Sequence, residues 1–308
     1  MMKRISLLLT LICLTISSYA IEPQTYEFAV IEGDTLRMDI YMPARPGELR
    51  SAVIFAFGGG FTNGSRNDPH YTTYLNFLAE NGVVAISTDY RTTLKKNSAL
   101  LKSPEGVAQA FVGAIKDAVS DFHAATCYLI QNAEKFGVDP DKIIASGSSA
   151  GAITALQAEY SICNGAMTVL PDDFRYAGVI SFAGAILCEG ALTWTTRPCP
   201  MQLYHGDADR NVPFSTISAG PLSLCGSETV AKSLADCAVP CEFHAFAGVN
   251  HSISNSPMID NLYDILGFVK RIDSGKESLS VNAVSNVPGV PVAPAAKITL
   301  EDIINANL

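Results

Sequence analysis

The stretch Gly147-Ser148-Ser149-Ala150-Gly151 decides the fold of this 308-residue chain. It follows an apolar run at 142–146 that predicts a strand, and it precedes an apolar segment at 150–161 that predicts a helix. A G-x-S-x-G pattern between a strand and a helix is typical of a tight turn that exposes a nucleophilic serine, with glycines where neighbouring side chains would collide. We therefore predict that Ser149 is a nucleophile. The alternative is a Gly/Ser-rich turn that fits the pattern by chance.

The segments on either side of this turn alternate between strand-like and helix-like patterns. Short, almost uniformly apolar runs predict buried strands at 52–57, 83–87, 143–146, 178–182, 201–204 and 242–246. Helical patterns lie between them, at 72–80, 107–136, 150–161, 228–238 and 257–272. A hairpin of two further strands is predicted at 26–31 and 35–42. The chain is thus predicted to be an α/β protein, with a mostly parallel sheet of about eight strands and helices on both faces.

A second glycine-rich stretch, Phe57-Gly58-Gly59-Gly60-Phe61, comes directly after the predicted strand at 52–57. Three successive glycines let backbone N–H groups approach a bound oxyanion closely, so an oxyanion hole is predicted here. A phosphate-cradling loop is disfavoured, because no Gly-Lys-Ser/Thr follows. A flexible turn is the remaining alternative.

Polar residues at the ends of two later strands supply an acid and a base. Asp209 follows the strand at 201–204 and is predicted to orient an imidazole and to stabilise its protonated form, with Asp207 as its competitor. His251 lies in a loop beyond the strand at 242–246 and is the predicted base. The remaining histidines are expected to be packing, loop or surface residues: His70, His123, His205 and His244.

These motifs resemble the esterase and lipase branch of the α/β-hydrolases, which includes carboxylesterases and hormone-sensitive-lipase-like enzymes. The chain order Ser, Asp, His is the order found in this superfamily. The resemblance covers about 26–272 and implies an α/β-hydrolase fold with a triad of Ser149, Asp209 and His251. It also implies an oxyanion hole formed by the N–H groups of Gly59, Gly60 and Ala150. No cofactor is expected.

Further segments carry the same resemblance, and one position departs from it. The segments are Asp89-Tyr90-Arg91, the helix with Asp117 and Asp121, and the run at 136–140. Phe57 stands where this group usually has a histidine before the three glycines. That histidine helps to hold the loop and is not the base, so the departure concerns loop geometry and not the triad. Asp89, Tyr90 and Arg91 are expected to be structural.

The motifs and the resemblance together predict a serine carboxylic-ester hydrolase that acts through an acyl-enzyme. The connection between the strands at 178–182 and 201–204 is short, which predicts a small cap or none. Phe61, Ser148 and Trp194 are expected to bind substrate, with simple packing as the alternative for Trp194. A shallow site suits short acyl groups, or acetyl and feruloyl esters carried on polysaccharide. The expected partner is therefore a small-molecule or polysaccharide-linked ester.

Two other functions fit part of the pattern. A serine peptidase of the prolyl-oligopeptidase type shares the His-Gly-x-x-Asp-x-x-Val pattern seen at 205–212. Such peptidases carry an N-terminal propeller, for which this chain offers no segment. A non-catalytic binding protein on the same fold is the second alternative, because fold alone does not fix function.

Charge and the N-terminal segment bear on the cellular context. The net charge of −9 and the pI near 5.0 disfavour a nucleic-acid partner, which would require a basic surface. Lys3 and Arg4 precede an apolar stretch at 5–16 and small residues at 18 and 20, which predicts a signal peptide over 1–20. That stretch is shorter than the roughly 20 residues needed to span a bilayer. Export to the periplasm or beyond, without stable membrane insertion, is expected.

The rest of the chain divides into two parts. A catalytic domain is predicted over 21–275, and a Pro/Val/Ala-rich linker with a short C-terminal tail over 276–308. Seven of the eight cysteines follow the predicted signal, and export permits disulfides, but spacing alone does not determine the pairing. The cysteine spacings fit no zinc-binding pattern, so no metal site is expected.

Overall fold

The computed structural model describes residues 21–44, 49–94, 96, 100, 103–275, 279–286, 298–299 and 302. The predicted signal peptide, the proline-rich run and nearly all of the predicted tail lie outside these residues.

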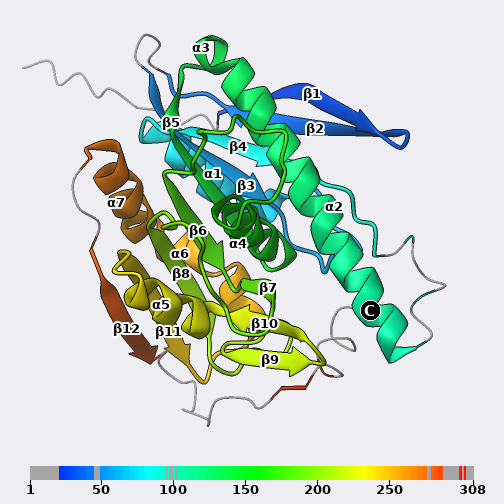
Figure 1. Ribbon diagram of the computed structural model, residues 1–308. Helices are drawn as coiled ribbons and strands as arrows, with labels where there is room; N and C mark the ends of the chain where they lie inside the picture. The colour runs from blue at the N-terminus through cyan, green and yellow to red at the C-terminus, as the bar shows by residue number, and fades with distance from the viewer. Residues whose placement is uncertain are drawn as a thin grey trace, which may run out of the picture.

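A nine-stranded sheet runs through the molecule, in the order β1-β2-β4-β3-β5-β6-β8-β11-β12 (Figure 1). The strands are β1 (Gln24–Ile31), β2 (Asp34–Tyr41), β3 (Arg50–Ala56), β4 (Val84–Thr88), β5 (Val138–Ser148), β6 (Gly178–Phe182), β8 (Met201–Gly206), β11 (Cys241–Ala247) and β12 (Val281–Asn286). Strands β1 and β2 pair antiparallel with each other, and β2 pairs antiparallel with β4. All further neighbours in the order given, from β4 through to β12, pair in parallel. The expected α/β-hydrolase fold, with a mostly parallel sheet, is confirmed.

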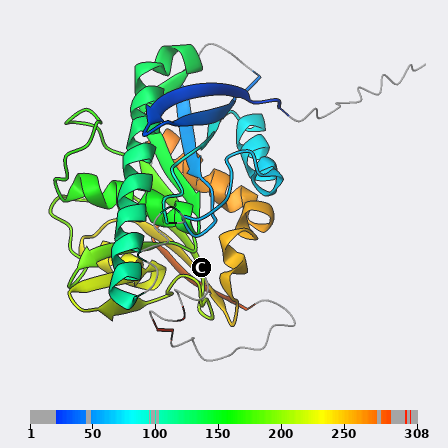
Figure 2. The ribbon, with the colours of Figure 1, turned by 90° about the vertical axis from the view of Figure 1, so that its right-hand side faces the viewer.

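Helices cover both faces of this sheet (Figure 2). They are α1 (Pro69–Glu80), α2 (Pro104–Gln131), α3 (Ala133–Phe136), α4 (Ala150–Cys163), α5 (Ser227–Asp236), α6 (Pro257–Asp260) and α7 (Leu262–Asp273), with a 3-10 helix, η3, at His251–Ser254. Helices α2 and α4 pack together on one face, and α1, α6 and α7 pack together on the other. Because both faces are covered, the central strands are buried along their whole length, as their uniformly apolar sequences predict.

The structure contains two features that the sequence patterns did not predict. Strand β12 lies inside the segment expected to be a linker, and it pairs in parallel with β11 to give the sheet its ninth strand. A separate three-stranded antiparallel sheet, in the order β7-β10-β9, stands beside the large one. Its strands are β7 (Ala185–Glu189), β9 (Thr216–Ala219) and β10 (Leu222–Gly226). Of its strands, only β7 lies in the connection between β6 and β8, whose shortness predicted a small cap or none.

The cysteines of the described residues are all free thiols. Cys188 on β7 and Cys225 on β10 come closest, with their Sγ atoms 3.7 Å apart. Within the same residues, no group of three or more His, Cys, Asp or Glu side chains is placed to hold a metal ion. No helix among them has the length and apolarity to cross a bilayer.

Candidate active site

Ser149 stands on a strained turn at the carboxyl end of β5, directly before α4. Its backbone has φ 52° and ψ −117°, a conformation that a non-glycine residue rarely adopts and that is costly unless the surroundings enforce it. A Cβ on Gly147 would lie 2.2 Å from the Gly151 carbonyl oxygen, and one on Gly151 would lie 2.1 Å from the Ala56 carbonyl oxygen. Both glycines of the motif are therefore required by close backbone packing, and the turn is the predicted elbow.

Three side chains from separate parts of the chain form a continuous hydrogen-bonded chain. Ser149 Oγ lies 2.8 Å from His251 Nε2, and His251 Nδ1 lies 2.7 Å from Asp209 Oδ2. The hydroxyl donates to Nε2, and the Nδ1–H donates to the carboxylate. The structure thus brings together the three residues predicted as nucleophile, base and acid, in a geometry that lets the imidazole take the serine proton.

The carboxylate of Asp209 is buried and has a hydrogen-bond donor at every side. Its Oδ1 accepts the backbone N–H groups of Asn211 and Val212, at 2.8 and 3.1 Å. Burial raises the pKa of Asp209, but hydrogen bonds from His205 and His251 outweigh it and hold the pKa well below its usual range. Asp209 is therefore ionised whenever the folded enzyme is in neutral solution.

Asp207, the competing candidate, has a different task. Its Oδ1 accepts the N–H of Gly248 at 2.6 Å. This bond ties the loop after β8 to the loop after β11, which carries His251. The side chain of Asp207 thus holds two loops together, while the contact to the imidazole belongs to Asp209.

The glycine-rich loop lies against the nucleophile, with several contacts holding its shape. The phenol of Tyr71 accepts the N–H of Gly58 at 3.0 Å, and the Tyr90 hydroxyl donates to the Phe57 carbonyl at 2.8 Å. A Cβ on Gly59, where φ is +133°, would lie 2.2 Å from the Asn63 carbonyl oxygen. Two tyrosines, Tyr71 and Tyr90, thus hold the loop that begins at Phe57.

Of the backbone donors predicted for an oxyanion hole, Gly59 and Gly60 line a hollow together with Ser149 and His251, and Ala150 directly follows the nucleophile. The N–H of Gly58 is already bonded to Tyr71, whereas among the described residues Gly59, Gly60 and Ala150 show no hydrogen bond from their N–H groups to an acceptor of the chain. Ala150 begins α4, so its N–H also carries the positive end of the helix dipole. These three groups can receive a developing oxyanion.

The hollow at the triad has a volume of about 380 Å³ and a polar lining. Its side chains carry hydroxyl, amide, carboxylate and imidazole groups: Thr62, Asn63, Asp68, Tyr71, Ser148, Ser149, Asn211, His251, Ser254 and Asn255. Of the side chains described, no aliphatic one lines it. The hollow can bind a polar group by hydrogen bonds, but it offers little surface for a long acyl chain.

The three predicted substrate-binding residues have different positions. Ser148 lines the hollow. Phe61 does not, because its positive φ of 59° turns the side chain into the core, where it packs edge-on against Tyr90 and Phe111. Trp194 also lies elsewhere and donates its Nε1–H to Ser233 at 3.1 Å. The prediction for Phe61 is corrected, because its side chain is fully buried in the core, whereas the role of Trp194 in substrate binding stays a prediction.

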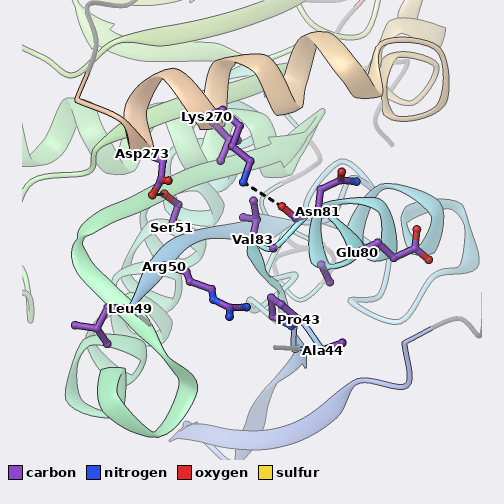
Figure 3. A pocket seen from close by; sticks show the side chains of 13 residues that line it. Pro43, Ala44, Leu49, Arg50, Ser51, Glu80, Asn81, Val83, Lys270 and Asp273 are labelled. Atoms are coloured by element: carbon purple, nitrogen blue, oxygen red, sulfur yellow. Dashed lines mark hydrogen bonds between the residues drawn. The ribbon is translucent and has the colours of Figure 1, made fainter. Parts of the chain in front are cut away.

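A larger hollow, of about 520 Å³, opens at the other end of the sheet (Figure 3). Ser51 and Val83, at the starts of β3 and β4, line it together with Lys270, whose Nζ donates to the Asn81 carbonyl at 3.1 Å. The triad stands at the carboxyl ends of the parallel strands, where ligands bind in open α/β sheets. The larger volume of this hollow therefore does not make it the active site.

Some residues of the site carry no signal in the sequence. Tyr71, on the first turn of α1, and Asn255, after η3, reach the site from helical segments with ordinary patterns. His205, expected to be structural, contacts Asp209, with 3.3 Å between Nε2 and Oδ2. The one signal for it was its place in Tyr-His-Gly-Asp near the end of β8, at the same edge of the sheet as the predicted acid.

Comparison with known proteins finds similarity to proteins named as esterases. The sequence model of the family described as BD-FAE matches residues 38–184, a range that includes the glycine-rich loop and the elbow but ends before Asp209. The chain is 34% identical over 124 residues to Fumonisin B1 esterase of Sphingopyxis macrogoltabida, covering 39% of this chain and 22% of that protein. It is 25% identical over 245 residues to a probable isoprenylcysteine alpha-carbonyl methylesterase of Oryza sativa subsp. japonica, covering 65% of this chain and 54% of that one. The chain therefore spans between about a fifth and about half the length of these relatives.

Solved structures show the same fold. Thermogutta terrifontis esterase 2 with bound propionate has a TM-score of 0.61 at 23% identity, with 82% of this chain and 94% of that chain covered. The same esterase phosphonylated by sarin has a TM-score of 0.61 at 22% identity, with 83% and 96% covered. The predicted resemblance to α/β-hydrolase esterases is confirmed.

Proposed function

We propose that this chain, a member of the α/β-hydrolase superfamily, is a serine carboxylic-ester hydrolase that acts through an acyl-enzyme. The observation that carries the proposal is the chain of contacts from Ser149 through His251 to Asp209, at 2.8 and 2.7 Å. The relatives with esterase names support it.

The mechanism follows from the positions of these groups. His251 takes the Ser149 proton while Oγ attacks the ester carbonyl, and Asp209 stabilises the imidazolium that forms. The tetrahedral oxyanion lies against the N–H groups of Gly59, Gly60 and Ala150. His251 then protonates the leaving alcohol, and water repeats the attack on the acyl-enzyme.

The substrate class that fits the hollow is a short acyl group on a polar alcohol. Hydroxyl and amide side chains such as Thr62, Asn63 and Asn211 can exchange hydrogen bonds with the hydroxyls of a sugar, whereas a long alkyl chain would meet no apolar wall. We therefore propose acetyl or feruloyl esters of carbohydrates as substrates. The predicted signal peptide supports export of such an enzyme to the compartment where plant polysaccharide is degraded.

The test is a panel of esters assayed with the wild type and with Ser149→Ala. It includes p-nitrophenyl acetate, a long-chain p-nitrophenyl ester, methyl ferulate and an acetylated xylo-oligosaccharide. We expect hydrolysis of short acyl or sugar-linked esters, and its loss in the variant. Faster hydrolysis of the long-chain ester would contradict the proposed substrate class, and activity that survives in the variant would contradict the mechanism.

A peptidase is the second candidate, because the same triad would cleave an activated amide. Fluorogenic dipeptide amides separate the two functions, and we expect them to be poor substrates. A fluorophosphonate probe separates an enzyme from a binding protein, since rapid labelling requires an activated serine.

A further inference from the structure

Two imidazoles contact the same carboxylate oxygen in this site. Asp209 Oδ2 lies 2.7 Å from Nδ1 of His251 and 3.3 Å from Nε2 of His205. His251 is partly exposed at the hollow, but the side chains of His205 and Asp209 are fully buried. The catalytic acid therefore has a second histidine behind it, on the side away from substrate.

His205 is held by contacts from three directions. It ends β8, its ring meets Phe214 edge-on at 5.6 Å, and its Nε2 also lies 3.3 Å from the Val212 carbonyl. Its Nδ1 lies 2.8 Å from the hydroxyl of Ser227, the first residue of α5. The ring therefore has partners at both nitrogens and little freedom to turn.

These partners determine which nitrogen carries the proton. The Ser227 hydroxyl lies 2.8 Å from Nδ1 and 3.4 Å from the Gly184 carbonyl, so it can either accept from the ring or donate to it. The partners of Nε2 therefore decide where the ring must carry a proton. Nε2 in turn faces two acceptors, the carboxylate of Asp209 and the carbonyl of Val212. The opposite tautomer would place a lone pair against a carboxylate.

We infer that His205 is a positioning residue of the active site, whose Nε2–H donates to Asp209 Oδ2. The inference rests on the proposed function. With this donor and the backbone donors at Oδ1, the carboxylate cannot rotate without losing hydrogen bonds. Oδ2 is thereby kept directed at His251, and the basicity of the carboxylate is moderated.

The pH dependence of kcat/KM distinguishes a positioning role from simple packing. In His205→Leu, the carboxylate loses a donor, becomes more basic and stabilises protonated His251 more strongly. The acid limb of the profile should then move to higher pH, by on the order of half a unit, with kcat reduced roughly tenfold or more. The amide of His205→Gln can donate to Asp209 and accept from Ser227. This variant should therefore keep most of the wild-type kcat and an acid limb close to the wild-type position.

Controls separate this effect from loss of packing. His123→Leu removes another buried histidine, which contacts the Ala158 carbonyl on α4, and it should reduce stability without moving the acid limb. Ser227→Ala removes the hydrogen-bond partner of Nδ1 while keeping the ring, and should shift the limb in the same direction as His205→Leu but by less. An acid limb that stays in place or moves to lower pH in His205→Leu would overturn the inference.

A second measurement does not depend on activity. In protein labelled with ¹⁵N-histidine, the resonances assigned by comparison with His205→Gln should report a proton on Nε2. A ring without a proton on Nε2 would overturn the inference even if the enzyme were fully active. Conversely, failure of the wild type to react with fluorophosphonate would overturn the proposed hydrolase function and leave the tautomer result standing.

Discussion

His251 Nε2 lies 2.8 Å from Ser149 Oγ, although 102 positions of sequence separate the two residues. The contact forms because β5 and β11 run parallel in one sheet, so the loops at their carboxyl ends open at the same edge. The predictions below follow from this arrangement.

Ser149→Ala should lower kcat on short esters by on the order of 10⁶, the scale found when such a nucleophile is removed. Fluorophosphonate labelling, read by intact mass, should also disappear. Ser161→Ala is the matched control, because this serine lies on α4, the helix that follows Ser149, and its hydroxyl donates to the Gln157 carbonyl. A small loss in Ser149→Ala, on purified protein, would remove Ser149 from its role.

Asp209→Asn should lower kcat by roughly 10⁴, because the amide reverses the tautomer of His251. The two backbone N–H groups at Oδ1 keep the amide oxygen on their side, which directs the NH₂ group at His251. The imidazole must then accept at Nδ1 and cannot take the serine proton at Nε2. Asp207→Asn, which affects only the bond to Gly248, should cost less than about tenfold. Equal losses in the two variants would contradict the assignment of the acid.

Tyr71→Phe should lower kcat by roughly 10 to 100-fold with little change in KM, because the glycine-rich loop loses the acceptor for the Gly58 N–H. Tyr74→Phe is a close control on the same helix. Its hydroxyl lies 3.2 Å from Ser146 Oγ in the core and does not contact the loop. We expect Tyr74→Phe to reduce stability but to leave kcat nearly unchanged, and similar kinetics in both variants would argue against a role for Tyr71 in the oxyanion hole.

The stability of the protein should fall in mild acid because of His123. Burial lowers the pKa of His123 to about 4, whereas an unfolded histidine titrates near about 6.5. Between these values the unfolded state binds a proton that the folded state does not. The contribution of neutral His123 to the free energy of unfolding is therefore complete above about pH 6.5 and is lost as the pH falls toward about 4. Urea denaturation should show a loss of about 2 kcal/mol from this residue between pH 7.5 and pH 5.

His123→Gln provides the comparison for this loss. The amide can still donate to the Ala158 carbonyl, as the ring does at 3.3 Å, but it does not titrate. Between pH 7.5 and pH 5, the free energy of unfolding of His123→Gln should therefore fall by about 2 kcal/mol less than that of the wild type. Parallel pH dependences in the two proteins would show that His123 is not responsible.

Much of the fold was predictable because its signals are local. The uniformly apolar strands and the elbow glycines are each determined by their nearest neighbours in sequence. Ser149, Asp209 and His251 were identified because each follows a predicted strand, and parallel strands place such residues at one edge.

The features that sequence analysis missed depend on distant contacts. Phe61 was assigned to the hollow, but the sign of its φ angle decides which way its side chain points. His205 could not be linked to the acid from sequence, since the orientation of its ring depends on a contact with Ser227, 22 residues away. The small β7-β10-β9 sheet has strands of only four or five residues, too short for a distinct pattern in the sequence.

Strand β12 has a practical consequence for where the domain can be cut. A protein designed to end at residue 275, the boundary that composition suggests, would leave the N–H and C=O groups of β11 unpaired along a bare edge. Such an edge invites pairing with another chain, so the shortened protein should aggregate. Since β11 continues into the loop that bears His251, the same cut would also weaken the support of the base. An expression boundary should therefore be placed after residue 286.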